Sequence, residues 1–193
     1  MQHVQKIIRS LCERAITERE TLTALDQIIG DGDFGVNIER GAVAILAALG
    51  ELEAPEPTDQ LLASLGMTLN GAGCGTCGTL ISFGMIAGAA RCDDAGAFLE
   101  AALARIIQAG HARPGDKTMI DALKPAVAVF QSGGNLECAA RAAWQGAEAT
   151  KDMVGAKGRS LYSGSRAKGI PDPGAYLVAA LMDEAVRCGG RNS

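Results

Sequence analysis

The spacing of its apolar residues limits how this chain can fold, because it follows the period of an α-helix almost from end to end. Near the N-terminus, Ile7, Ile8, Leu11 and Ala15 share one face, and charged residues separate them. No segment alternates apolar and polar residues over five or more positions, as a half-buried strand would. The first helical pattern ends near residue 24, and others follow at 36–49, 59–70, 77–91, 94–110, 117–131, 135–152 and 174–188. About eight antiparallel helices with short connections predict an all-α, up-and-down barrel or bundle.

Two of these helices have recognisable starts. Asp172 precedes Pro173, which places a capping carboxylate before the residue best suited to a first helical turn. Asp116 can cap the helix of 117–131 in a similar way. Only 4% of the residues are aromatic, and the Ala, Leu and Ile that dominate suit close helix packing. Without a linker, repeat or low-complexity tract, we expect a single domain over residues 1–193.

Charge and hydropathy argue against two classes of partner. The net charge of −4 does not favour broad nucleic-acid binding, which depends on a basic surface. The longest apolar run, residues 42–49, is far shorter than the roughly 20 residues that cross a bilayer. Charged residues interrupt the N-terminal stretch, so it does not resemble a secretory signal. We therefore expect a soluble, cytoplasmic protein that binds neither nucleic acid nor membrane.

The six cysteines are expected to be reduced thiols, because disulfides are rare in the cytoplasm. Cys74 and Cys77 form C-G-T-C, a spacing that also occurs in zinc and redox sites. A zinc site would need a second pair of ligands, whereas the next cysteine, Cys92, is single. A thioredoxin-like site would need a βαβ unit, which the pattern does not contain. Ordinary loop and core cysteines are the simplest interpretation.

One loop has an unusual density of negative charge. Residues 25–37 read LDQIIGDGDFGVN, so that Asp26, Asp31 and Asp33 lie within eight positions, next to glycines. If these carboxylates met at about 4 Å, each pair would repel by roughly 4 kcal/mol at an effective dielectric constant near 20. Either the side chains point apart, or a cation lies among them.

The residues of this loop favour Mg²⁺ over Ca²⁺. An EF-hand counted from Asp31 would need a ligand at its fifth position and a glutamate at its twelfth, where the chain has Gly35 and Ala42. Mg²⁺ binds through a few carboxylates and completes its octahedron with water and phosphate oxygens. Two such ions bridging a polyphosphate would neutralise the aspartates. An acidic turn that only caps a helix would leave one aspartate unexplained.

Three further loops are typical of ligand binding, although each has a simpler explanation. Residues 71–79, GAGCGTCGT, could bring the backbone close to an anion at a helix start, or merely allow tight packing. Residues 113–119, RPGDKTM, indicate by themselves no more than a helix start. Residues 157–174, KGRSLYSGSRAKGIPDPG, could cover an anionic group or form a solvated surface, and their basic residues are Lys157, Arg159, Arg166 and Lys168.

In this order, the stretches LDQIIGDGDFGVNIERG, RPGDKTMIDALKPAV and AKGRSLYSGSRAKGIPDPGA resemble the nucleotide-binding L subunit, or L domain, of dihydroxyacetone kinases. The resemblance spans nearly the whole chain. It implies an all-α barrel of eight antiparallel helices whose loops bind two Mg²⁺ and ADP or ATP at one end. It also implies that Asp26, Asp31 and Asp33 hold the metals and, with Arg166, support catalysis. The nucleotide contacts it implies are Phe34, Gly35, Val36, Asn37, Ala72, Gly73, Gly110, Met119, Arg166, Asp172, Pro173 and Gly174.

The chain departs from this family at two positions. The family usually has a histidine after its second Asp-Gly-Asp aspartate, where this chain has Phe34. Its glycine loop usually resembles G-G-x-S-G, whereas Gly71-Ala72-Gly73-Cys74-Gly75 lacks the serine. Side-chain donors to phosphate are therefore missing, although backbone N–H groups remain. Catalysis by positioning and charge neutralisation can continue without them, but the preferred nucleotide or acceptor can differ.

The resemblance implies that a γ-phosphoryl group passes to dihydroxyacetone or a related short ketose, which a separate K subunit holds on its own histidine. This chain has only His3 and His111, neither in a convincing sugar pocket, so the sugar-binding half should come from that partner. Two versions stay open, one in which a phosphocarrier protein recharges bound ADP and one in which ATP exchanges. A homodimer is possible. The alternative function is a nucleotide-binding module that serves another acceptor protein, as in fatty-acid kinases, or a regulatory partner.

Overall fold

The computed structural model describes residues 2–52, 54, 56–157, 161 and 164–189, apart from the side chains of Gln2, Ser165 and Arg166. Within these ranges the chain is all-helical and contains no strand, which confirms the predicted fold class. The α-helices are α1 (Gln2–Thr17), α2 (Arg19–Ile29), α3 (Phe34–Gly50), α4 (Thr58–Gly71), α5 (Gly75–Ala89), α6 (Ala95–Gly110), α7 (Ile120–Gln131), α8 (Leu136–Ala149) and α9 (Pro173–Gly189). Two short 3-10 helices, η1 (Thr150–Asp152) and η3 (Gly164–Ala167), lie between α8 and α9.

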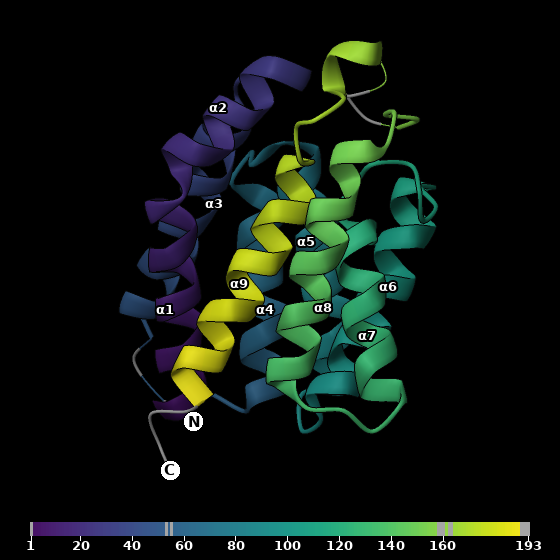
Figure 1. Ribbon diagram of the computed structural model, residues 1–193. Helices are drawn as coiled ribbons and strands as arrows, with labels where there is room; N and C mark the ends of the chain where they lie inside the picture. The colour runs from purple at the N-terminus through teal and green to yellow at the C-terminus, as the bar shows by residue number, and fades with distance from the viewer. Residues whose placement is uncertain (1, 53, 55, 158–160, 162–163, 190–193) are drawn as a thin grey trace.

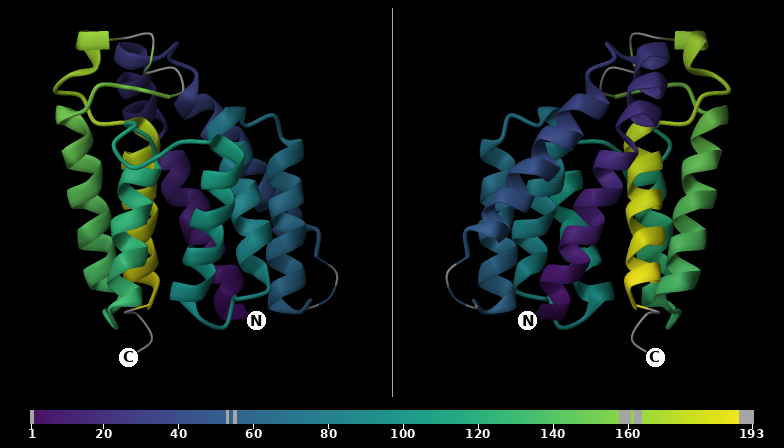
Figure 2. Two further views of the ribbon diagram at one scale, coloured as in Figure 1. Left: turned by 90° about the vertical axis from the view of Figure 1, so that its right-hand side faces the viewer. Right: turned by 90° about the vertical axis from the view of Figure 1, so that its left-hand side faces the viewer.

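The helices run up and down around the molecule (Figure 1). Consecutive helices from α3 to α9 pack against each other, and α9 also packs against α1, so the last helix meets the first. The connections α2–α3, α4–α5, α6–α7 and α8–α9 all lie at the upper end (Figures 1 and 2). The described parts of the loops with a composition typical of ligand binding therefore lie at one end of the bundle, as the sequence predicts.

The N-terminal helical pattern forms two helices rather than the single one predicted to end near residue 24. The break lies at Glu18, a buried residue whose carboxylate pairs with Arg14 at 2.6 Å and accepts a hydrogen bond from the Tyr176 hydroxyl at 3.1 Å. After the break, α2 continues upward beyond the upper ends of α8 and α9 (Figure 1). Because α2 ends at Ile29, Asp26 lies at the upper end of the molecule.

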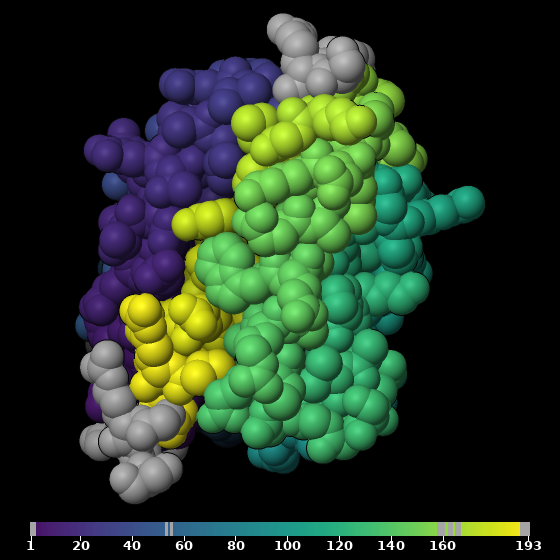
Figure 3. All heavy atoms as spheres, in the orientation of Figure 1, coloured from purple at the N-terminus to yellow at the C-terminus, as the bar shows by residue number. Residues whose placement is uncertain are grey.

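Small side chains let the helices at the C-terminal side of the bundle approach closely. The core between α7, α8 and α9 is built mainly from buried alanines, at 122, 126, 139, 140, 143, 147, 175 and 179. A Cβ atom on Gly146 would lie 2.1 Å from the Asp121 carbonyl oxygen, so α8 can pack on α7 only with glycine at this position. The exposed faces of α8 and α9 cover this core (Figure 3). This agrees with the low aromatic content of the sequence.

Two predictions of helix starts have different outcomes. Asp172 caps α9 as predicted, because its Oδ2 accepts a hydrogen bond from the Ala175 N–H at 2.8 Å. The prediction that Asp116 caps α7 is wrong, since its carboxylate instead accepts from the Arg113 N–H at 2.7 Å. The helix also begins at Ile120 rather than 117, because Lys117 has a left-handed backbone, with φ of 61°.

All six cysteines are free thiols, as the sequence predicts. Across the described residues, the helices are too short or too polar to pass through a lipid bilayer.

Candidate functional site

The loop between α2 and α3 is shaped by the carboxylate of Asp26. This buried side chain accepts hydrogen bonds at Oδ2 from the Gly32 N–H at 2.9 Å and the Phe34 N–H at 3.1 Å. A Cβ atom on Gly30 would lie 2.0 Å from its other oxygen, Oδ1, and Gly32 has a left-handed φ of 78°. The glycines between the aspartates are therefore required to wrap the loop around this carboxylate.

The three aspartates of this loop come together in space. Asp26, Asp31 and Asp33 each offer an oxygen, and these atoms all lie within 4.8 Å of one another. Asp31 and Asp33 retain contact with solvent, whereas Asp26 is buried. Two oxygens bound to one Mg²⁺ at about 2.1 Å lie about 3–4 Å apart. The cluster therefore fits a magnesium ion after small side-chain movements, and its oxygen donors are those that this ion prefers.

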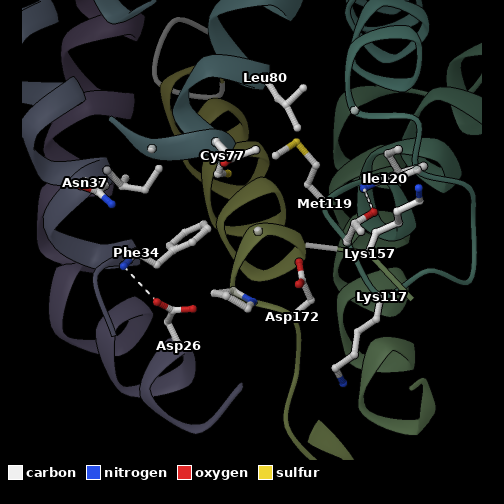
Figure 4. A pocket seen from close by; sticks show the side chains of 18 of the residues that line it. Asp26, Phe34, Asn37, Cys77, Leu80, Lys117, Met119, Ile120, Lys157 and Asp172 are labelled. Atoms are coloured by element: carbon white, nitrogen blue, oxygen red, sulfur yellow. Dashed lines mark hydrogen bonds between the residues drawn. The ribbon is translucent and has the colours of Figure 1, made fainter. Parts of the chain in front are cut away.

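A cavity of about 220 Å³ lies beside the aspartates, between α2, α3, the start of α5, the α6–α7 connection and the start of α9 (Figure 4). Phe34 and Asp172 face it from opposite sides. Nine of the residues predicted from the sequence line it: Asp26, Asp33, Phe34, Asn37, Gly110, Met119, Asp172, Pro173 and Gly174. The structure thus brings together residues from four separate stretches of the sequence.

The other predicted residues whose side chains the structure describes are not among those that line this cavity. A Cβ atom on Gly35 would lie 2.1 Å from the Arg19 carbonyl oxygen, so this glycine lets α3 approach α2. Gly73 has a left-handed φ of 65°, and its carbonyl accepts from Arg40 Nη1 at 2.7 Å. Ala72 is the residue after α4. Asp31 belongs to the aspartate cluster, and Val36 follows Gly35 in α3. The Arg166 side chain and all of Arg159 lie outside the described residues, and the Arg166 backbone belongs to η3.

The glycine-rich stretch directs the N-terminus of α5 toward the cavity. Gly75, Thr76 and Cys77 line the wall, and Gly75 has a left-handed φ of 68°. The side chain of Cys74, the residue before this helix, does not cap it. Its thiol instead donates to the Leu69 carbonyl at 3.0 Å, and it is buried. A helix N-terminus offers backbone N–H groups to an anion, so this wall can meet phosphate even though the serine of the family is missing.

The surroundings of Cys74 and Cys77 argue against metal or redox chemistry. Burial raises the pKa of both thiols, and the carboxylate of Asp172 raises the pKa of Cys77 further. A thiol must lose its proton before it becomes a good metal ligand or nucleophile. These cysteines therefore act as small apolar residues of the wall, as the simplest interpretation of the sequence had it.

The opposite wall contains a buried carboxylate whose protonation is shifted. Asp172 is almost completely buried, and this raises its pKa from 3.8 to about 7. Hydrogen bonds from the Ala175 and Gly174 N–H groups and the nearby charge of Lys117 act in the opposite direction. The backbone N–H of Asp172 donates to Thr150 Oγ1 at 2.9 Å. Asp172 is thus fixed by α9 on one side and by the end of α8 on the other.

Lys117 also lines the cavity, and sequence reasoning did not single it out. Its side chain is fully buried, and its Nζ donates to three carbonyl oxygens, of Thr150, Ala167 and Ile170. Burial lowers its pKa, while the charges of Asp172 and Asp152 partly restore it. The stretch RPGDKTM drew attention to this position, but no local pattern predicts contacts with carbonyls so far along the chain.

Comparisons with known proteins agree on one family. Residues 28–187 match the family model of the DAK2 domain. The chain is 35% identical over 177 residues to the ADP-binding subunit DhaL of PEP-dependent dihydroxyacetone kinase 1 from Listeria innocua, an alignment that covers 88% of this chain and 87% of that protein.

Two solved structures of the dihydroxyacetone kinase of C. freundii are similar over 97% of this chain and 34% of theirs. The native form gives a TM-score of 0.82 with 30% identity. The complex with AMP-PNP and Mg²⁺ gives a TM-score of 0.78 with 29% identity. The chain therefore spans most of the Listeria subunit but about a third of the longer kinase chain.

Proposed function

This chain belongs to the DAK2 domain family, and on that premise we propose that it is the nucleotide-binding subunit of a kinase that phosphorylates dihydroxyacetone or a related short ketose. The observation that carries the proposal is the cluster of Asp26, Asp31 and Asp33 beside the cavity. Acidic side chains that meet next to a helix N-terminus suit a metal-bound polyphosphate, because the metals bind both carboxylate and phosphate oxygens.

Each part of the wall has a role in this proposal. The aspartates hold Mg²⁺, in two ions if the family pattern applies, and the N-terminus of α5 binds phosphate through backbone N–H groups. The apolar side chains of Phe34 and Met119 contact the nucleotide, and Arg166 is expected to contact a phosphate through its guanidinium group. Bound Mg²⁺ supplies charge neutralisation for the transferred phosphoryl group. The chain itself orients the nucleotide and presents its terminal phosphate at the upper end of the bundle.

The acceptor is expected to come from another protein. Neither His3 nor His111 lines the cavity, so this chain offers no histidine there to hold a sugar. We propose a ketose-binding K subunit as the partner, in the cytoplasm. The name of the Listeria relative describes it as part of a PEP-dependent kinase. This supports the version in which ADP stays bound and a phosphocarrier protein of the phosphotransferase system recharges it.

Calorimetry tests nucleotide binding directly. We expect ADP to bind when Mg²⁺ is present and to bind far more weakly when it is chelated. A hundredfold excess of Mg-ADP over its dissociation constant should raise the free energy of unfolding by about 2.7 kcal/mol. Absence of Mg-dependent binding would overturn the proposal.

A transfer assay then tests the acceptor. The chain, its cognate K subunit and dihydroxyacetone should yield the phosphorylated ketose when ATP, or the phosphocarrier with PEP, is supplied. Mg-ADP binding without transfer to any short ketose would favour the alternative function, a nucleotide-binding module that serves another acceptor protein.

A further inference from the structure

We propose that Lys117 is a positioning residue of the nucleotide site, which fastens both ends of the connection between α8 and α9 and makes no contact with phosphate. The inference rests on the proposed function, because it concerns how one wall of that site is held in place. All the contacts that support it lie within the described residues, and none of them involves the aspartate cluster.

The contacts of the Lys117 ammonium group use its full donor capacity. Nζ donates to the carbonyl oxygens of Thr150 at 2.5 Å, Ala167 at 2.9 Å and Ile170 at 2.7 Å. A lysine ammonium group has three N–H donors, so none is left for a ligand. A lysine beside a phosphate site is usually interpreted as a phosphate ligand, but this one is fully buried and already satisfied.

The three acceptors lie on both sides of the connection. Thr150 comes at its start, 33 residues after Lys117, and Ala167 and Ile170 come near its end, 50 and 53 residues after Lys117. One side chain therefore binds backbone segments at both ends of the connection. The Gly169 N–H also donates to the Lys151 carbonyl at 2.8 Å, so a further hydrogen bond joins the two ends of the connection.

The turn before α7 fixes Lys117 in this position. The Asp121 carboxylate accepts hydrogen bonds from the N–H groups of Gly115 and Thr118, on either side of Lys117. The left-handed φ of 61° at Lys117 is unfavourable for a residue with a side chain, so the surrounding contacts must maintain it. Asp121 thus holds the turn, and the turn directs Lys117 toward the three carbonyls.

The segments that Lys117 joins are connected to both walls of the site. η3, whose last residue is Ala167, packs against α2, the helix that carries Asp26. Asp172 follows two residues after Ile170 and lines the cavity. Figure 4 shows the Lys117 side chain running away from the carboxylate of Asp172 and the ring of Phe34. Releasing this ammonium group should therefore displace both the η3 segment and Asp172.

Chemical modification of the wild-type protein distinguishes a positioning role of Lys117 from direct contact with a phosphate, and it needs no variant. Reductive methylation, followed by mass spectrometry, should modify Lys117 more slowly than the exposed Lys124 by about tenfold or more, with or without Mg-ADP. If Lys117 instead reacted as fast as Lys124 in the free protein and became protected by Mg-ADP, it would contact the phosphate and the proposal would fail.

Substitution tests the consequence for the loop. In Lys117→Met, trypsin should cut at Lys157 or Lys168 about tenfold faster than in the wild type, and Mg-ADP should bind about tenfold more weakly. Lys117→Arg should share both defects, because a planar guanidinium group cannot direct its N–H groups to three converging carbonyls. Lys124→Met is the matched control and should change neither measurement.

Two results would contradict the proposal. One is weaker Mg-ADP binding in Lys117→Met with an unchanged rate of loop cleavage, and the other is full affinity in Lys117→Arg. Cleavage and methylation need no nucleotide, so they test the positioning role even if the wild-type protein fails to bind Mg-ADP, an outcome that would overturn the proposed function alone.

Discussion

The two walls of the site are built in different ways. The aspartate loop is local: the Asp26 carboxylate accepts from N–H groups only six and eight residues further along the chain. The opposite wall depends on distant contacts, because Lys117 and the Asp172 backbone reach partners between 22 and 53 residues away. A local wall can keep its shape while its chemistry is altered, whereas the distant wall depends on the packing of α7, α8 and α9.

The largest effect is expected where the local wall loses a charge. Asp31→Ala or Asp33→Ala should weaken Mg-dependent ADP binding by about a thousandfold or more, since each removes an oxygen from the aspartate cluster that we propose holds Mg²⁺. Both side chains retain contact with solvent, so helical content by circular dichroism should stay unchanged. Calorimetry measures the affinity, and the exposed Asp93→Ala is the control for the loss of one charge. Unchanged affinity in either variant would remove Mg²⁺ from this loop.

The same difference explains how much of the molecule could be predicted from the sequence. Helical periodicity identified the all-α bundle and most helices to within a few residues, because it reflects local backbone geometry. The spacing of Asp26, Asp31 and Asp33 identified the acidic cluster for the same reason. The break at Glu18 was missed, since the Tyr176 hydroxyl that meets it comes from α9. A contact with a residue far along the chain does not change the local sequence pattern from which helices are predicted.

The opposite wall shows this limit more clearly. Asp116 has the right residue type to cap α7, yet the turn of 115–118 is organised by Asp121, and the helix starts later than predicted. Lys117 stands in a stretch that resembled a plain helix start, because its three acceptors follow only from the fold. The metal and nucleotide roles of the predicted residues, Arg166 included, stay predictions that binding measurements can test.

The pH dependence of the free energy of unfolding tests Asp172 in the opposite wall. The pKa of Asp172 is raised from 3.8 to about 7, so the folded state holds a proton that the unfolded state releases. The free energy of unfolding should therefore be unaffected by this group below about pH 4, fall between about pH 4 and 7, and level off above. Each pKa unit corresponds to about 1.4 kcal/mol, which gives a loss of about 2–4 kcal/mol. The charge of Lys117 reduces this effect, and that of Asp121 increases it.

Asp172→Asn isolates this contribution, because the amide oxygen can still accept from the Ala175 N–H. Urea unfolding at pH 5 and pH 8, without Mg²⁺ or nucleotide, should show a smaller loss of stability with rising pH in the variant than in the wild type. The exposed Asp93→Asn should leave the wild-type difference in place. Equal pH dependence in Asp172→Asn and wild type would mean that Asp172 is charged in the folded protein throughout.

A smaller change tests whether the local wall depends on its glycines. In Gly30→Ala the new methyl group would lie 2.0 Å from Asp26 Oδ1, so the Asp26 carboxylate must move out of its place in the aspartate cluster. Mg-ADP affinity by calorimetry should fall by about tenfold. Gly50→Ala is the matched control, since a Cβ atom there meets no other atom within 4 Å and alanine favours a helix. If both variants bound alike, the loop would tolerate a displaced Asp26.

The smallest effect on binding is expected at Phe34, which belongs to the local wall. Its N–H donates to Asp26, and its side chain packs against the hydrophobic core and lines the cavity. A histidine there, as is usual in the family, could donate to a phosphate and would titrate near its ordinary pKa of about 6.5. Because the aspartates would still hold the metals, Phe34→His should keep Mg-ADP affinity within about threefold and change the rate or acceptor preference of transfer. Phe34→Leu, which keeps an apolar side chain without a ring nitrogen, is the control.

Transfer assays with the cognate K subunit and several short ketoses then decide between two interpretations of Phe34, an active kinase subunit and a binding module. Activity in the wild type would mean that metals and backbone N–H groups suffice for catalysis. If the wild type were inactive on every ketose and Phe34→His restored turnover, the local wall would have kept its metals and lost its chemistry, and the chain would be a binding module.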